Sequence, residues 1–241
     1  MKEITSLQNP VVKLAASLQQ KKFRDETGLF LVEGETPCRD AIARGWECVH
    51  LFVHDAQYCI DDDTILVSRE ILEKISKKDN PQSVIGVFRQ HLATLPQAAE
   101  FYLALEEIRD PGNLGTIMRT AHAVNHPHLI MVGQCCDPFA PEVIRASMGS
   151  FSFVSLTHMQ QDEFLAWQKE QRLAMLGTDV LHADDYRDAD YRRAIVVMGN
   201  EQKGLSEALK SRCTGRIKIP MPGGTESLNL SVASALILYQ V

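Results

Sequence analysis

The sequence predicts an α/β protein whose larger, C-terminal part is a mainly parallel sheet with helices on both faces. From about residue 99, short apolar segments of strand length alternate with segments whose apolar residues recur at helical spacing. The apolar segments are nearly continuous, which is typical of strands buried on both faces. Hydrophobic residues make up 45% of the chain and charged residues 23%, the ordinary range for a globular protein.

The C-terminal part contains six segments that predict strands and five that predict helices. The expected strands lie within FYLALEEI (101–108), HLIMVG (128–133), FSFVSLT (151–157), LAMLGTDV (173–180), AIVVMG (194–199) and RIKIPM (216–221). The expected helices lie within NLGTIMRTAHAV (113–124), PEVIRASM (141–148), DEFLAWQKEQ (162–171), LSEALK (205–210) and TESLNLSVASALILYQV (225–241). Ligands of parallel sheets usually bind at the carboxyl ends of the strands, so we expect the site there.

The N-terminal part predicts a small α/β domain over residues 1–92. Its segments change more often between the two periodicities: helices are expected in 9–19, 37–45 and 69–76, and strands in 28–35, 48–53, 64–68 and 83–88. The stretch 89–100 is polar, contains Pro96 and loses periodicity, so we expect a linker at 93–98 and a second domain at 99–241.

Cysteine usage favours a cytoplasmic protein, and the net charge argues against a surface that binds nucleic acid as a whole, while it leaves room for a local basic face. The formal net charge is −6, and the six cysteines show neither CxxC pairing nor disulfide-like spacing. The N-terminus has no apolar segment of signal-peptide length. The apolar tail, residues 228–241, is shorter than the roughly 20 residues that a spanning helix needs, so we do not expect a membrane anchor.

The first polar turn at a strand end is RDPGN (109–113), which carries Pro and Gly in turn-compatible places. We expect Asn113 to cap the helix that follows it. His122, His126 and His128 come later, but Pro127 interrupts the helix and no other ligand completes a set. We therefore expect no metal site.

Two further turns follow later strands. After AIVVMG, Asn200 and Glu201 lead to Gly204, and Ser206 is placed to cap a helix. This turn is neither a GxGxxG fingerprint nor a phosphate-binding loop with GK[ST]. The third turn, after RIKIPM, leads into the tail, where Ser227 or Asn229 is placed to cap the last helix.

In this order, the three turns resemble a known set of motifs. DPGNLGTIMRTAHAV (110–124), VVMGNEQKGLS (196–206) and IPMPGGTESLNLSVASALILY (219–239) are similar to the three signature motifs of the SpoU family. Its members are RNA ribose 2′-O-methyltransferases of the SPOUT superfamily. The N-terminal part, with LFLVEGE and PQSVIGVF, resembles the small substrate-binding domain of many members, which is related to a ribosomal-protein-like RNA-binding fold.

The resemblance implies transfer of a methyl group from S-adenosyl-L-methionine to a ribose 2′-hydroxyl of RNA. It also implies a C-terminal trefoil knot and a homodimer whose active site draws on both subunits. Ribosomal RNA is the expected substrate. The alternatives are transfer RNA, or a relative that binds RNA without catalysis. Another cofactor-binding enzyme with a Rossmann-like sheet would need a glycine-rich first turn, which RDPGN is not.

The resemblance also assigns residues by position. The catalytic residues would be Asn113, Arg119, Glu201, Ser227 and Asn229; the cofactor would contact Thr178, Gly199, Asn200, Ile219, Met221 and Leu228. We expect a local basic patch to bind RNA through Lys21, Lys22, Arg24, Arg109 and Arg145. A guanidinium, with a pKa above about 12, resists deprotonation, so we expect Arg119 to hold a phosphate rather than act as a base.

Overall fold

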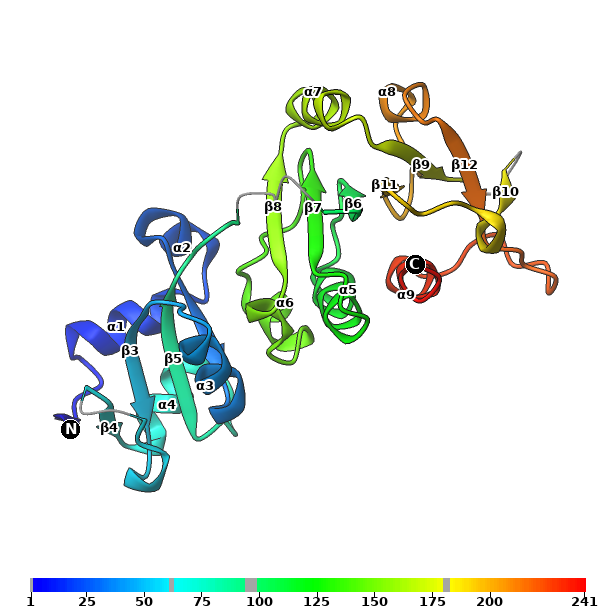
Figure 1. Ribbon diagram of the computed structural model, residues 1–241. Helices are drawn as coiled ribbons and strands as arrows, with labels where there is room; N and C mark the ends of the chain where they lie inside the picture. Colours follow the sequence, from blue (N-terminus) through cyan, green and yellow to red (C-terminus); the bar gives the residue numbers. More distant parts are fainter. Residues whose placement is uncertain (1, 61–62, 94–98, 180–182) are drawn as a thin grey trace. The chain divides into compact units, whose positions relative to one another are not determined.

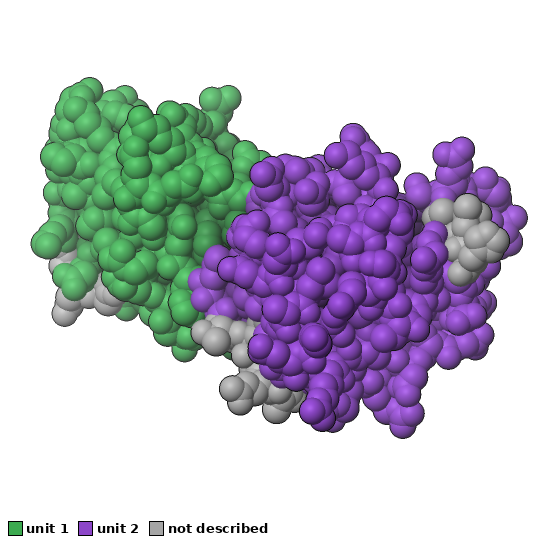
Figure 2. Space-filling view, turned by 90° about the horizontal axis from the view of Figure 1, so that it is seen from above, with its two compact units in different colours: residues 1–91, 137–153 green, residues 92–136, 154–241 purple. Residues whose placement is uncertain are grey.

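The computed structural model describes residues 2–60, 63–93, 99–179 and 183–241, which pack as two compact units. The first comprises residues 1–91 and 137–153, and the second comprises residues 92–136 and 154–241 (Figure 2). The segment 137–153 therefore packs with the first unit, although it lies inside the range expected for the second domain. Residues 94–98 of the expected linker lie outside the described residues.

The first unit contains a mixed sheet. Its described strands have the order β1-β4-β3-β5-β2, in which β5 is antiparallel to β2 and β3, and β4 is parallel to β1 and β3. The elements are β1 (Lys2–Ile4), α1 (Pro10–Ser17), α2 (Lys21–Thr27), β2 (Leu29–Glu33), α3 (Glu35–Ala43), β3 (Cys48–Val53), η1 (Ala56–Tyr58), β4 (Ile65–Val67), α4 (Arg69–Ser76), β5 (Val84–Arg89), α6 (Pro141–Ala146) and η2 (Ser150–Ser152).

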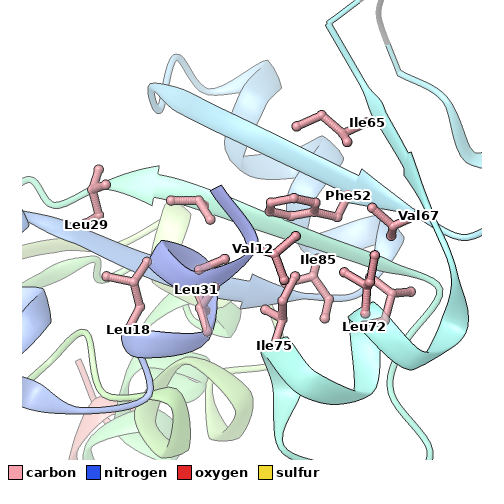
Figure 3. Packing of buried hydrophobic residues seen from close by; sticks show 13 residues of the cluster. Val12, Leu18, Leu29, Leu31, Phe52, Ile65, Val67, Leu72, Ile75 and Ile85 are labelled. Carbon is pink, nitrogen blue, oxygen red and sulfur yellow. The ribbon is translucent and has the colours of Figure 1, made fainter. Parts of the chain in front are cut away.

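Helices α1 and α4 form the main core of this unit with the sheet. Val12 of α1 and Leu72 and Ile75 of α4 point toward Leu31 and Phe52 on the strands (Figure 3). All five side chains are at most 2% exposed. The expected helix in 69–76 is therefore α4, and its apolar residues at helical spacing form its buried face.

Aromatic packing explains why residues 137–153 belong to the first unit. The ring of Phe139 lies 4.9 Å from that of Phe30, and the ring of Phe151 lies 5.7 Å from Phe30 and 5.3 Å from Trp46. The expected strand FSFVSLT is partly wrong for the same reason, because Phe151 lies in the 3₁₀ helix η2 and strand β8 begins only at Ser155.

The second unit is built on a wholly parallel sheet, as the sequence predicts. Its described strands have the order β10-β12-β9-β11-β6-β7-β8, and every neighbouring pair is parallel. The elements are β6 (Phe101–Glu106), α5 (Pro111–Ala123), β7 (His128–Val132), β8 (Ser155–Met159), α7 (Gln161–Gln171), β9 (Ala174–Thr178), β10 (Asp184–Asp185), η3 (Tyr186–Asp188), β11 (Ala194–Met198), α8 (Glu207–Lys210), β12 (Gly215–Lys218) and α9 (Leu230–Leu238).

Helices cover both faces of this sheet. Phe164 of α7 and Leu209 of α8 pack in one cluster with Tyr102 and Ala104 of β6 and Ile195 of β11. Helices α5 and α9 lie on the opposite side and pack against each other (Figure 1). This arrangement leaves the carboxyl ends of the central strands as the edge where loops from different motifs meet.

The C-terminal tail is a short helix within this layer. Helix α9 covers nine residues, Leu230–Leu238, and Ile237 and Leu238 are fully buried. Within the described ranges, none of the helices combines the length and apolar content needed to cross a bilayer.

Candidate active site

The three motif turns follow strands of one parallel sheet. The first follows β6, the second follows β11, which is hydrogen-bonded to β6, and the third follows β12, two places further along. Strands β6, β11, β9 and β12 are all parallel, so their carboxyl ends lie at the same edge. Segments more than a hundred residues apart are thereby brought together, as in other open parallel sheets.

The helix that follows the first motif turn is capped by a residue that we did not expect. The carboxylate of Asp110 accepts a hydrogen bond of 2.7 Å from the backbone N–H of Asn113, and Pro111 begins α5. The prediction that Asn113 is the cap is therefore wrong, because the helix starts two residues earlier, at the proline. Asn113 lies inside the first turn of the helix, and its buried side chain is available for other contacts.

The second turn is a tight loop closed on itself. The backbones of Asn200 and Gly204 exchange hydrogen bonds of 3.1 and 2.9 Å. Gly199 lies so close to this closure that an added Cβ would be 2.3 Å from the Gly204 carbonyl carbon and 2.3 Å from the Leu205 nitrogen. Only glycine permits this approach. Ser206 caps α8, as predicted, because its Oγ accepts from the Leu209 N–H at 3.3 Å.

The third turn ends in the cap of α9. Of the two residues considered, Asn229 is the cap: its Oδ1 accepts from the backbone N–H groups of Ser231 and Val232 at 2.9 and 3.3 Å. The same oxygen accepts from the Ser231 hydroxyl at 2.6 Å. The Asn229 amide nitrogen therefore remains available to donate elsewhere.

A chain of side-chain hydrogen bonds joins the three turns. The Asn229 amide donates to Asn113 Oδ1 at 2.9 Å, and the Asn113 amide donates to Glu201 Oε1 at 3.2 Å. Asn200 extends the chain, because its amide donates to the Glu107 carbonyl at 2.9 Å and to Glu201 Oε2 at 3.5 Å. The structure thus brings together three of the five residues expected to be catalytic.

The other two expected catalytic residues are exposed. Arg119 is on the solvent side of α5, and Ser227 lies in the exposed segment before α9. Within the described parts of the chain, no side-chain hydrogen bond or ion pair connects either residue to the Asn113 network. The Ser227 carbonyl accepts from the Thr225 hydroxyl at 3.3 Å. Their catalytic assignment stays a prediction.

The expected cofactor residues follow three neighbouring strands. Thr178 ends β9, and its hydroxyl donates to the Val197 carbonyl of β11 at 3.2 Å. Ile219 and Met221 follow β12 and are half-buried, while Leu228 is 36% exposed. Together with Gly199 and Asn200, these residues offer apolar side chains and loop backbone at one edge. That combination suits a ligand with an aromatic ring and polar groups.

Two acidic residues at this edge were not among those expected from the sequence. Glu106 is 5% exposed, and its Oε2 accepts from the Ser206 N–H at 2.8 Å. The next residue, Glu107, has a left-handed φ of 49°, and its carbonyl accepts from Asn200. The available signal was a carboxylate at the end of an otherwise apolar strand, FYLALEEI.

One of the expected RNA-binding residues is instead structural. Arg24 is 3% exposed, and its guanidinium lies 2.7 Å from the Asp137 carboxylate and donates to the Leu18 carbonyl at 2.8 Å. The expectation that Arg24 binds RNA is wrong, because its donors are used inside the first unit and the side chain does not reach solvent.

The remaining basic residues reach solvent but have acidic neighbours. Lys21 and Lys22 pair with acidic residues one helical turn ahead on α2. Arg109 lies 3.3 Å from Glu107 and is 53% exposed. Arg145 is half-buried and lies 3.5 Å from the buried carboxylate of Glu33. Their role in RNA binding stays a prediction.

The histidines do not gather into a metal site in the described structure. In the described portion of the chain, no group of three His, Cys, Asp or Glu side chains is arranged to hold a metal ion. His128 is partly buried, and its Nδ1 has no hydrogen-bond partner among the described residues. Burial, with a smaller contribution from the charge of His126, lowers the pKa of His128 below its ordinary value.

Comparison with protein families agrees with this geometry. The model of the SpoU rRNA Methylase family matches residues 100–239, which contain all three motif turns. The chain belongs to the SpoU rRNA methylase family. The family expected from the motifs is confirmed. The model of the MRM3-like substrate binding domain matches residues 9–86, within the first unit.

Two relatives are similar to this SpoU-family chain over nearly their whole length. A 23S rRNA (uridine(2479)-2′-O)-methyltransferase of Streptomyces viridochromogenes is 30% identical, covering 99% of this chain and 91% of the relative. The 23S rRNA (guanosine(2553)-2′-O)-methyltransferase RlmP of Bacillus subtilis is 26% identical, covering 100% and 99%. These two relatives modify nucleotides with different bases.

A solved structure of an rRNA methyltransferase supports both the fold and the cofactor. The crystal structure of an AdoMet-bound rRNA methyltransferase from Sinorhizobium meliloti superimposes with a TM-score of 0.92 at 37% identity, covering 99% of this chain and 96% of that one. AdoMet is S-adenosyl-L-methionine. The predicted α/β architecture, a parallel sheet preceded by a small α/β domain, is confirmed by this similarity.

Proposed function

We propose that this SpoU-family protein transfers the methyl group of S-adenosyl-L-methionine to a ribose 2′-hydroxyl of ribosomal RNA. The observation that carries the proposal is the hydrogen-bonded chain Asn229–Asn113–Glu201, which joins the three family motifs at one sheet edge. A relative that only binds RNA would have no need to keep this network. Transfer RNA is the second candidate substrate, and the similarity to 23S rRNA methyltransferases favours ribosomal RNA.

The residues at the edge fit S-adenosyl-L-methionine. Gly199 brings the loop backbone close to β11, and Thr178, Ile219, Met221 and Leu228 supply polar and apolar groups on neighbouring segments. The cofactor supplies a methyl group already activated on a sulfonium. The protein therefore needs mainly to align the hydroxyl with that group and to assist loss of one proton.

Arg119 is the residue that we assign to the RNA. Its exposed guanidinium can hold the phosphate beside the target ribose with two parallel hydrogen bonds. Its positive charge next to the 2′-hydroxyl also lowers the pKa of that hydroxyl, and the proton leaves to water. Asn113, Glu201 and Asn229 keep the start of α5 and the two loops in register. Ser227 completes the site from the loop before α9.

RNA binding also needs contacts away from the reacting ribose. We assign these to Lys21 and Lys22 in the first unit, and to Arg109 and Arg145 as secondary contacts. Acidic neighbours partly neutralise each of these residues. We therefore expect the affinity for RNA to fall with salt, with a slope that corresponds to only a few phosphate contacts. The separate first unit fits the recognition of nucleotides exposed in RNA loops.

We propose that the active form is a homodimer to which α9 contributes. Val232, Leu236 and Tyr239 follow one another at helical spacing and are 49%, 38% and 72% exposed. Such an apolar stripe is typical of a surface that a partner covers. Replacing Leu236 with Glu should shift the dimer to a monomer in light scattering; an unchanged monomeric mass for both proteins would contradict the proposal.

We also propose the C-terminal trefoil knot and the cytoplasmic location. The return of the chain from β12 to pack α9 on α5, across the intervening strands, supports the first. A crystal structure with an unknotted chain trace would exclude it. The six cysteines without disulfide-like spacing and a ribosomal RNA substrate support the second, which fractionation of cells would test.

Methylation of purified RNA tests the main proposal. The protein is incubated with labelled S-adenosyl-L-methionine and either ribosomal RNA or transfer RNA, and the 2′-O-methyl sites are mapped. We expect label at one ribose of ribosomal RNA. If the protein binds the cofactor and neither RNA accepts label, the non-catalytic alternative replaces this function. If only transfer RNA is labelled, the substrate assignment is wrong.

A further inference from the structure

Glu106 is a charged residue buried at the carboxyl end of strand β6. Its side chain is 5% exposed, and it follows five strand residues that are all buried and apolar. A buried carboxylate is unfavourable unless hydrogen bonds compensate for its lost hydration. Its Oε2 accepts from the backbone N–H of Ser206 at 2.8 Å, a residue one hundred positions away. The carboxylate of Glu106 is therefore hydrogen-bonded to a loop that belongs to another motif.

That loop is the second family motif, and it is held at both ends. At its start, the Asn200 amide donates to the Glu107 carbonyl at 2.9 Å. At its end, the Ser206 N–H donates to the Glu106 carboxylate. The last residue of β6 and the residue that follows it thus hold the two ends of the loop.

The backbone of Glu107 makes this double contact possible. Its φ of 49° is in the left-handed region, which residues other than glycine seldom adopt. At this position the Glu107 carbonyl accepts from Asn200 while the neighbouring Glu106 carboxylate accepts from Ser206. A sparsely populated conformation of this kind persists only where the surrounding contacts hold it.

Besides these two end contacts, the loop is held by the hydrogen bond from the Asn113 amide to Glu201 and by the buried side chain of Leu205. Glu201, Gln202, Lys203 and Gly204 are exposed, and inside the loop the Asn200–Gly204 closure fixes its shape rather than its position on the sheet. A loop that is to bind a ligand with backbone groups must be positioned beforehand, because ordering it on binding would reduce the affinity.

We infer that Glu106 is a positioning residue that sets the affinity for S-adenosyl-L-methionine by anchoring the end of this loop through the Ser206 N–H. The inference rests on the proposed function, which assigns Gly199 and Asn200 to the cofactor. Glu106 itself touches neither reactant. Its contribution is to hold the loop in the conformation that the cofactor needs.

Two substitutions at position 106 separate the acceptor from the charge. Glu106→Gln keeps an oxygen that can accept from Ser206, whereas Glu106→Ala removes it. A hydrogen bond to a charged group is typically worth enough to change a binding constant by about 10- to 100-fold. We expect the Kd for S-adenosyl-L-methionine, measured by calorimetry, to rise at least about tenfold in Glu106→Ala and by less in Glu106→Gln, which keeps a neutral acceptor.

The same bond can be removed from the opposite side. Ser206 has a φ of −65°, which proline also adopts, so Ser206→Pro deletes the N–H with little backbone change. Ser206→Ala keeps the N–H and loses the hydroxyl, which caps α8 and donates to Gln161 at 3.4 Å, and serves as the matched variant. We expect Ser206→Pro to weaken cofactor binding as Glu106→Ala does, with no further loss in the double variant.

Reference variants make the outcome decisive. Glu100→Gln, an exposed carboxylate beside the other end of β6, should keep the parental Kd, and Asn200→Ala should weaken binding. If Asn200→Ala weakens binding but Glu106→Ala and Ser206→Pro do not, the positioning role is refuted and the cofactor loop stands. If none of the three changes the Kd, the assignment of the loop to the cofactor fails as well. Equal losses in Glu106→Ala and Glu106→Gln would also overturn the inference.

Discussion

The amide of Asn229 donates a 2.9 Å hydrogen bond to the side-chain oxygen of Asn113, across 116 positions of the sequence. Asn229 also caps α9, and Asn113 passes the connection on to Glu201. The start of one helix is thereby tied to the start of another, and both are tied to a loop. The substitutions below test what each part of this arrangement contributes.

Asn229→Asp should separate the cap from the network. An aspartate still accepts from the first N–H groups of α9, so the thermal midpoint should change little. It cannot donate to Asn113, whose amide must then turn and give up its bond to Glu201. We expect methyl transfer to fall at least about tenfold at nearly unchanged stability, whereas Asn229→Ala should also cost about 1 kcal/mol of unfolding free energy. Equal activity of the Asp variant and the parent would contradict a role for the network.

Arg119→Lys should reduce turnover without weakening cofactor binding. Lysine keeps the positive charge but loses the planar fork that holds a phosphate with two hydrogen bonds. Because the side chain is exposed, stability should change by less than about 0.5 kcal/mol. Single-turnover methylation and calorimetric cofactor titration of the same preparation give the two readouts. Normal turnover at pH 7 would show that the guanidinium fork is not needed.

Gly199→Ala should disrupt the cofactor loop. The new methyl group would be 2.3 Å from backbone atoms of Gly204 and Leu205, and backbone cannot move aside as a side chain can. We expect a loss of about 1–3 kcal/mol in stability and at least a tenfold increase in the cofactor Kd. Gly223→Ala is the matched control, because its Cβ would meet nothing within 4 Å. A similar Kd for both variants would show that the close approach at Gly199 is unimportant.

Arg24→Ala should destabilise the first unit rather than affect RNA binding directly. The substitution leaves the carboxylate of Asp137, whose side chain is 11% exposed, without its partner. Breaking such a buried pair typically costs about 3–5 kcal/mol. Lys21→Ala, at an exposed pair on the same helix, should leave the unfolding midpoint nearly unchanged. Denaturant unfolding of the two variants checks this, and equal midpoints would show that the buried pair is not structural.

His128→Phe should flatten the pH dependence of stability. Burial lowers the pKa of His128 below its ordinary value of 6.5, so the unfolded chain binds a proton more readily than the folded one. Stability is therefore lost as pH falls through 6.5 towards the lower folded value. Phenylalanine removes this loss. It also removes a buried nitrogen without a described partner, so we expect the free energy of unfolding at pH 7 to rise by about 1 kcal/mol. The free energy of unfolding is measured at pH 5 and pH 7.5 for the parent and for His128→Phe. The same difference between the two pH values in both proteins would show that His128 does not cause the pH dependence.

The sequence pattern predicts most elements of the second unit because its strands are buried on both faces. Near-continuous apolar segments leave little choice of structure, and AIVVMG becomes β11 as expected. FSFVSLT fails because alternating apolar residues look like a strand wherever they occur. Phe151 packs against Phe30 and Trp46, more than a hundred residues away. This packing, which the local sequence does not show, determines the structure of the segment.

The sequence named three residues that the fold brings together, but it did not predict their contacts. Motif similarity pointed to Asn113, Glu201 and Asn229, while only the folded chain connects their side chains. Glu106 was missed because two consecutive acids at a strand end resemble a solvated turn. Arg24 was misassigned because a charge within a basic cluster gives no sign of a buried partner 113 positions further on.

The placement of residues 137–153 has a consequence for dividing the protein. The chain passes from one unit to the other after residues 91, 136 and 153, so no single cut separates them. A fragment of residues 1–91 would lack Phe139, Phe151 and Asp137 and would leave Phe30 and Arg24 uncovered. In the complementary fragment, residues 92–241, the rings of Phe139 and Phe151 would lose their contacts with Phe30 and become exposed to solvent. Exchange of the first unit between relatives therefore has to move two separate stretches of the gene together.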